Sequence, residues 1–279
     1  MRKTLLLTAA LAIATSAFAQ QQQIRAPRPS PSASLTQTVG ITDVTIKYSR
    51  PGVKGRQIWG GLVPYDKVWR AGANEATTIS FSDDVWIGGQ KLAKGTYSFH
   101  ATPGRDQWTL HFNSVADQWG SYSYDASKDV VTVKVTPETA PHQEWMGFEV
   151  QDLTTDTAKI ALRWEKVSVP FTVDTKSTER TITQFRNAMN PDWRTPYMAA
   201  NFAFENKGAA TDAEMTAWID QSLKANQNIA NLYLRARMAE RAGNKADAIR
   251  YGEMAIAAAT PQQGDFAAEV RRNVDLWKK

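Results

Sequence analysis

The sequence predicts an α+β protein, with an N-terminal antiparallel β-sandwich followed by a C-terminal bundle of about six helices. Between residues 35 and 174, short runs of β-branched and aromatic residues alternate with turn residues. Between residues 175 and 279, apolar residues recur at helical spacing instead. Hydrophobic residues make up 42% and charged residues 22% of the chain, which excludes wholesale disorder, collagen and coiled coil. We therefore expect two folded regions that meet near residue 174.

The first 19 residues have the pattern of a secretory signal peptide. A short basic start at residues 1–3 precedes an uncharged run, rich in Leu and Ala, that extends to Ala17. Ala17 and Ala19 supply the small residues that signal peptidases require, so we expect cleavage after Ala19 and a periplasmic or extracellular protein. No later stretch approaches the roughly 18 consecutive apolar residues of a membrane span.

Residues 20–34 are rich in Gln and Pro and contain few apolar side chains, which predicts a flexible tether. Basic residues exceed acidic ones only slightly and are scattered, so the charge pattern argues against nucleic acid binding. The chain has no cysteine, which excludes a disulfide framework and a Cys-ligated metal site.

Seven or more short strands are expected between residues 35 and 174, and the segment 96–113 predicts a hairpin. Its two strands share one core only if their apolar residues have the same parity in the pairing. Those residues are Tyr97, Phe99, Trp108, Leu110 and Phe112. This register sets His100 beside His111 on the opposite face, where we expect exposed polar side chains. His142 is distant in sequence, so we expect no metal site.

The helical region contains several start and stop signals. Thr211 precedes Glu214 in a near capping box, and Thr195-Pro196 is typical of a helix start. Residues 231–261 resemble one tetratricopeptide repeat, with Gly243 at the turn between two helices. A single repeat cannot bury its apolar face alone, so we expect it to pack on neighbouring helices or on the sandwich.

The segment 48–77 has the densest unusual chemistry, and a loop this long is uncommon in a compact sandwich unless it is functional or packed over the fold. Arginine binds carboxylates or phosphates, and aromatic rings offer stacking faces. The same residues can instead have a structural role, in which Glu75 forms an ion pair with Arg50, Arg56 or Arg70 and holds the loop. The candidate ligand-binding residues are Arg50, Arg56, Trp59, Trp69, Arg70, Asn74 and Glu75.

Several long motifs also lie in the β-rich region: YSRP, KGRQIWGGLVPYDKVWRAGANEAT, GTYSF, DQWTLHFN and DQWGSYSYD. Over roughly residues 30–170 the chain resembles the domain-of-unknown-function 2911 family of exported bacterial proteins. The resemblance implies a β-rich domain and export. It implies no established activity, so it assigns no catalytic residue.

The sequence contains no G-x-S-x-G, H-E-x-x-H, G-x-G-x-x-G or Walker motif, and we expect neither a metal nor another cofactor. The favoured hypothesis is a binding or interaction module that uses the 48–77 loop and the helical surface for a protein or carbohydrate ligand. A glycan hydrolase that pairs Glu75 with Asp66 or Asp83 is one alternative. A purely structural scaffold is the other.

Overall fold

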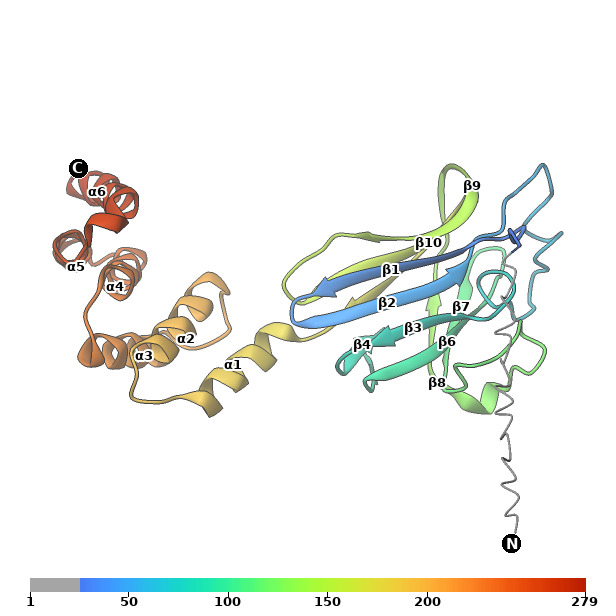
Figure 1. Cartoon of the computed structure of the whole chain (residues 1–279), viewed down its shortest axis with the longest axis horizontal. Coiled ribbons are helices and arrows are strands. Elements are labelled where there is room, and N and C mark those ends of the chain that lie inside the picture. The colour runs from blue at the N-terminus through green and yellow to red at the C-terminus, as the bar shows by residue number, and fades with distance from the viewer. Residues whose placement is uncertain (1–25) are drawn as a thin grey trace, which may run out of the picture.

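The computed structural model describes residues 26–279 and contains two antiparallel sheets followed by six helices (Figure 1). The predicted α+β architecture is therefore confirmed. The expected signal peptide, and residues 20–25 of the expected tether, lie outside the described residues. Within residues 26–279, no helix combines the length and the apolar character that a membrane span needs.

The larger sheet has six strands in the order β1-β2-β3-β6-β7-β8. Their bounds are β1 Ser32–Val39, β2 Thr42–Ser49, β3 Thr77–Phe81, β6 Gly95–Thr102, β7 Trp108–Asn113 and β8 Asp129–Val135. Each strand alternates between the two faces of the sheet. In β2, Val44 and Ile46 are buried in the core, whereas Lys47 is exposed on the outer face.

The smaller sheet has four strands in the order β5-β4-β10-β9 and packs against the inner face of the larger one. Its strands are β4 Val85–Ile87, β5 Gln90–Leu92, β9 Glu138–Gln151 and β10 Thr157–Asp174. One hydrophobic core fills the space between the sheets, and in it Phe171 of β10 contacts Phe99 and Phe112 of the larger sheet. The outer face of the six-stranded sheet is left free of the second sheet.

The sandwich begins earlier than the sequence predicts. Strand β1 starts at Ser32, inside the expected tether, and pairs with β2 along its whole length. Before it, the backbone N–H of Arg50 donates to the Pro31 carbonyl at 2.8 Å. Residues 32–34 of the expected tether therefore belong to strand β1. Composition alone does not reveal a cross-strand partner, and this partner makes the segment part of the fold.

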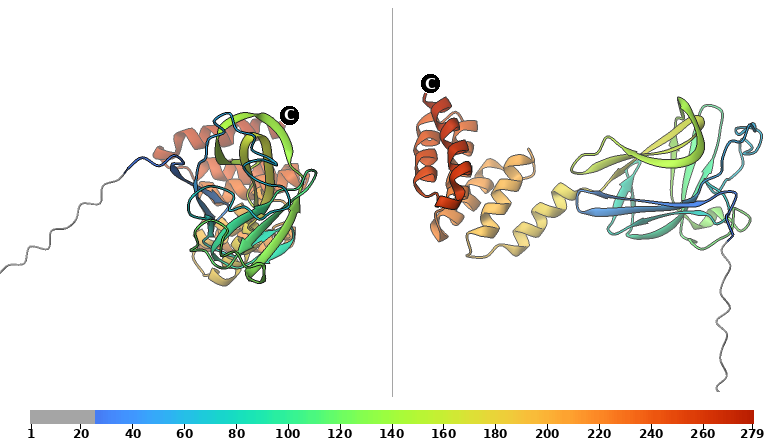
Figure 2. Two further views of the ribbon diagram at one scale, coloured as in Figure 1. Left: turned by 90° about the vertical axis from the view of Figure 1, so that its right-hand side faces the viewer. Right: turned by 45° about the horizontal axis from the view of Figure 1, so that its top comes forward.

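The six helices form an array that extends away from one end of the sandwich (Figures 1 and 2). They are α1 Ser177–Ala188, α2 Arg194–Glu205, α3 Asp212–Ala225, α4 Ile229–Arg241, α5 Lys245–Ala257 and α6 Gly264–Lys278. One small core joins α1 to α4, and a second joins α4, α5 and α6. Gly252 lets α5 approach α6 closely, because a Cβ there would lie 2.3 Å from a methyl group of Val274. A helix pair, α4–α5, occupies the expected repeat segment, and its assignment as a tetratricopeptide repeat stays a prediction.

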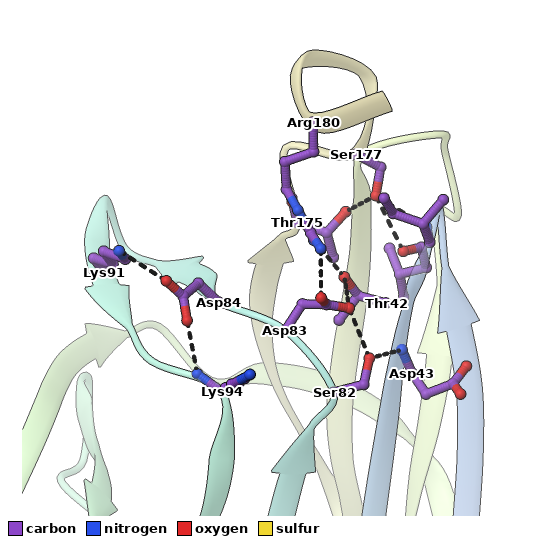
Figure 3. Close-up of polar contacts among 12 residues, drawn as sticks. Thr42, Asp43, Ser82, Asp83, Asp84, Lys91, Lys94, Thr175, Ser177 and Arg180 are labelled. Atoms are coloured by element: carbon purple, nitrogen blue, oxygen red, sulfur yellow. Dashed lines mark hydrogen bonds and ion pairs between the residues drawn. The ribbon is translucent and has the colours of Figure 1, made fainter. Parts of the chain in front are cut away.

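Polar contacts anchor α1 to the end of the sandwich (Figure 3). Arg180 forms an ion pair with Asp83 and also donates to the Thr42 hydroxyl at 2.9 Å. The Ser177 hydroxyl accepts from the backbone N–H of Ile41 at 3.1 Å. Strand β10 ends at Asp174 and α1 begins at Ser177, so the structure changes from strand to helix where the periodicity changes.

Candidate functional site

Two of the predicted arginines hold the backbone of the 48–77 loop. Arg50 donates from Nε to the Met146 carbonyl of β9 at 2.7 Å. Arg56 donates to the carbonyls of Val53 and Gly52 at 3.1 and 2.6 Å. These contacts tie the loop to the second sheet and to itself, which is a structural use of the guanidinium groups.

The two predicted tryptophans of the loop lie at the edge of the sandwich core. Trp59 packs edge-on against Trp108 and Trp164, with ring centroids 4.8 and 5.7 Å apart. Trp69 stacks on Trp164 at 5.8 Å and donates from its indole N–H to the Gly72 carbonyl at 3.1 Å. The rings therefore anchor the loop on the core by apolar burial and aromatic contact.

The remaining predicted residues, Arg70, Asn74 and Glu75, lie where the loop reaches the outer face of the larger sheet. The Asn74 side chain donates to the Ser30 carbonyl at 3.1 Å, and the backbone carbonyl of Asn74 accepts from the backbone N–H of Gly120 at 3.1 Å. Its φ of +58° is a conformation that Asn tolerates better than most residues. Asn74 thus joins the N-terminal segment to the loop between β7 and β8.

Glu75 forms an ion pair, but with a partner that the sequence did not predict. It accepts from Arg28 at 2.7 and 2.9 Å, and both side chains are 51% exposed. Hydrogen bonding to Arg28 lowers the pKa of Glu75. The expected internal pair with Arg50, Arg56 or Arg70 is wrong, because Arg50 and Arg56 bind backbone carbonyls. Arg28 comes from the segment expected to be a tether.

An open groove of about 1050 Å³ lies on the outer face beside this ion pair. Three stretches that are distant in sequence form it: the N-terminal segment with β1, the region from β2 to β3, and the loop after β7. We call it the outer-face groove. It is lined by Ala26, Arg28, Pro31, Ser32, Ala33, Ser34, Lys47, Tyr48, Ser49, Glu75, Ala76, Thr78, Ala116, Asp117 and Gln118.

The strand register explains why the floor of the groove is polar. Ser34, Lys47 and Thr78 are consecutive cross-strand partners on β1, β2 and β3. The same row continues through Ser98 of β6. Gln118 donates to the Ser98 hydroxyl at 3.0 Å, and this bond connects the groove with the region under the β7–β8 loop.

A hydrogen-bonded polar network lies under this loop, residues 114–128. His111 Nδ1 is 2.9 Å from Asp129 Oδ2, and His111 Nε2 is 2.9 Å from the Thr102 hydroxyl. Tyr124 donates its hydroxyl to Asp129 at 2.5 Å, and Asn113 donates to the other carboxylate oxygen at 2.8 Å. Burial and the bond to Asp129 raise the pKa of Tyr124, so this hydroxyl keeps its proton. Sequence analysis did not find this network.

His100 pairs with His111 across β6 and β7, so the two lie on one face of the sheet as predicted. The expectation that both would be exposed polar residues is wrong, because the 114–128 loop covers them and His100 is 0% exposed. Neither ring nitrogen of His100 has a hydrogen-bond partner within residues 26–279. Burial lowers the pKa of His100 to about 4; the backbone of Gly120 opposes this shift but lies outside hydrogen-bond geometry. The sequence pattern indicated that the two histidines share a face, but it did not predict that the 114–128 loop covers them.

Two other polar atoms under the loop resemble the ring nitrogens of His100 in this respect. Arg70 Nε and Gln118 Oε1 are buried without hydrogen-bond partners in the described chain. His142 lies elsewhere, on β9, 3.6 Å from Glu144. No group of three or more His, Asp or Glu side chains among residues 26–279 is arranged to hold a metal ion.

Comparison with known proteins gives a family for the sandwich. The family described as Protein of unknown function (DUF2911) matches residues 30–173. The chain belongs to this family. The DUF2911 match includes the polar network and most of the outer-face groove, whereas helices α1 to α6 lie beyond it. No curated protein and no solved structure matches the chain.

Proposed function

We propose that this DUF2911 protein is an exported binding protein, and that its outer-face groove holds a polar, extended ligand such as an oligosaccharide. One observation carries the proposal: a groove of about 1050 Å³ that three sequence-distant segments build on an otherwise open sheet face. A groove of this size is in the range of specific ligand sites. The signal-peptide pattern of residues 1–19 supports export.

The chemistry of the groove suits a ligand rich in hydroxyl groups. Ser32, Ser34, Ser49 and Thr78 contribute hydroxyls, and Gln118 contributes an amide. Such groups both donate and accept hydrogen bonds.

The rim and the polarity favour a carbohydrate over a protein segment. Trp119 forms a backbone bridge with the groove residue Glu75 and is 57% exposed, and an exposed aromatic ring is a typical stacking surface for a sugar. The buried centre of a protein–protein interface is usually more apolar than the lining of this groove.

The predicted glycan hydrolase receives less support. Glu75 precedes β3 and Asp83 follows it, so the five residues of that strand separate them. At ~3.4 Å per residue the ends of this strand are roughly 14 Å apart. Paired carboxylates in glycosidases are about 5–10 Å apart. Asp66 is also outside the groove lining, and its backbone N–H donates to the Pro103 carbonyl.

The helical array supports a second, separate contact surface. It extends away from one end of the sandwich (Figure 1), and none of its residues lines the outer-face groove. We propose that α4 and α5 form a tetratricopeptide-like pair that contacts a protein partner. A purely structural scaffold would need the array but not the groove.

A ligand screen with matched variants tests the proposal. The melting temperature is measured with a panel of oligosaccharides for the parent protein, Thr78→Arg and Thr132→Arg. Thr78 lines the groove, whereas Thr132 lies outside it as an exposed residue of β8. A ligand at one hundred times its dissociation constant stabilises by about 2.7 kcal/mol. We expect stabilisation of the parent and Thr132→Arg but not of Thr78→Arg. Equal stabilisation of all three proteins would reject the groove as the site.

A further inference from the structure

The polar network under the β7–β8 loop has the connectivity of a nucleophile, a base and an orienting carboxylate. Thr102 Oγ1 is 2.9 Å from His111 Nε2, and His111 Nδ1 is 2.9 Å from Asp129 Oδ2. A hydroxyl bonded to one imidazole nitrogen, with a carboxylate on the other, is the arrangement that activates hydroxyl nucleophiles. We propose that Thr102 is a nucleophile that attacks acyl esters, with His111 as its general base. This inference is independent of ligand binding in the groove.

The hydrogen-bond partners of Thr102, His111 and Asp129 assign the protons among these three groups. The carboxylate of Asp129 only accepts, so His111 carries its proton on Nδ1 and directs it at Asp129. Tyr124 and Asn113 both donate to Asp129 as well, which fixes the carboxylate in place. Nε2 of His111 is therefore free to accept the proton of the Thr102 hydroxyl.

All three groups are partly exposed. The side chains of His111 and Asp129 are 12% and 10% exposed, and Thr102, at the end of β6, is partly exposed as well. A bond that served only to hold the strands together would not require a buried carboxylate on the far nitrogen of His111.

The proposed reaction is acyl transfer. Thr102 Oγ attacks the carbonyl carbon of an ester while its proton moves to His111 Nε2. The bond from the acyl carbon to the leaving oxygen breaks, and His111 returns the proton to that oxygen. Water then attacks the acyl-threonine with His111 as base, the acid is released, and Thr102 regains its proton. The net reaction consumes one ester and one water and yields one acid and one alcohol.

His111 and Asp129 activate the Thr102 hydroxyl, and we expect the substrates to be small esters with good leaving groups. The test uses p-nitrophenyl acetate on the full mature protein, with the acetyl group located by mass spectrometry of peptides. The variants are Thr102→Val, Thr102→Ser and His111→Gln, each checked for folding by circular dichroism. Thr109→Val is the matched control, because Thr109 is the cross-strand neighbour of Thr102.

We expect acetylation of Thr102 in the parent and in Thr109→Val, and of the new serine in Thr102→Ser. Thr102→Val should lose this adduct, and His111→Gln should slow its formation by on the order of 100-fold. A purely structural network would give no adduct at position 102, or one whose rate is the same in His111→Gln, and either result overturns the proposal.

Discussion

Burial of His100 predicts a specific loss of stability in acid. In the folded protein its pKa is lowered to about 4, mainly by burial, from an ordinary value of 6.5. As the pH falls below 6.5, the unfolded chain binds a proton on this residue and the folded chain does not. Protons therefore favour unfolding, and the contribution of His100 to stability is lost progressively as the pH falls toward 4. Below pH 4 both states are protonated, and the effect levels off.

The magnitude follows from the size of the shift. A pKa difference of about 2.5 corresponds to about 3 kcal/mol, at 1.36 kcal/mol for each unit. The assay is urea unfolding, followed by tryptophan fluorescence, at pH 7 and at pH 4. The parent should lose about 3 kcal/mol more between these pH values than His100→Leu does, because leucine cannot titrate.

His142→Leu is the control for this comparison, because His142 is 48% exposed on β9. Its pH dependence should follow that of the parent. Carboxylates titrate in all three proteins, so only the difference between them reports on the histidine. If the parent and His100→Leu lose the same free energy, His100 is not buried as described, and the loop does not cover it.

Four other outcomes are expected. Glu75→Ala should change the free energy of unfolding by about 1 kcal/mol or less, since its ion pair is exposed; a loss near 3 kcal/mol in denaturant would reveal a buried pair. Trp164→Ala should cost about 3–5 kcal/mol by the same assay, because this ring is 1% exposed amid the tryptophan cluster, and a smaller loss would contradict that packing. A fragment of residues 26–174 should fold alone with a β-type circular dichroism spectrum; an unfolded fragment would mean that the helices complete its core. Intact mass should show that the exported protein begins at Gln20, and full-length chain retained in the cytoplasm would contradict processing.

The parts of the fold that were predicted correctly depend on local periodicity. Alternation in β6 and β7 fixes which residues face the core, so Phe99 and Phe112 share the core face and His100 and His111 share the other face, as the pattern predicts. The exact partners do not follow from it, because alternation sets only the parity of the pairing. The change from strand to helix near residue 174 is visible for the same reason, since periods of 2.0 and 3.6 residues are easily distinguished. Neither inference needs a contact between distant parts of the chain.

The errors all concern contacts between distant segments. Arg28 lies 47 residues before Glu75, in a segment whose composition indicates disorder. His100 is buried by a loop that begins fourteen residues later, and no sequence feature near His100 predicts that the loop covers it. The seven candidates of the 48–77 loop were chosen for their chemistry. In the structure, four of them hold the loop itself, namely Arg50, Arg56, Trp59 and Trp69.

The most direct test of the binding proposal is the footprint of a bound oligosaccharide measured by hydrogen–deuterium exchange. The ligand is the one that gives the largest stabilisation in the thermal screen, and exchange is compared with and without it across the full mature chain. The groove predicts slower exchange in residues 26–34, 75–78 and 116–118, with helices α1 to α6 unchanged. Protection confined to the helices, with those three segments unaffected, would contradict the assignment of the outer-face groove as the binding site.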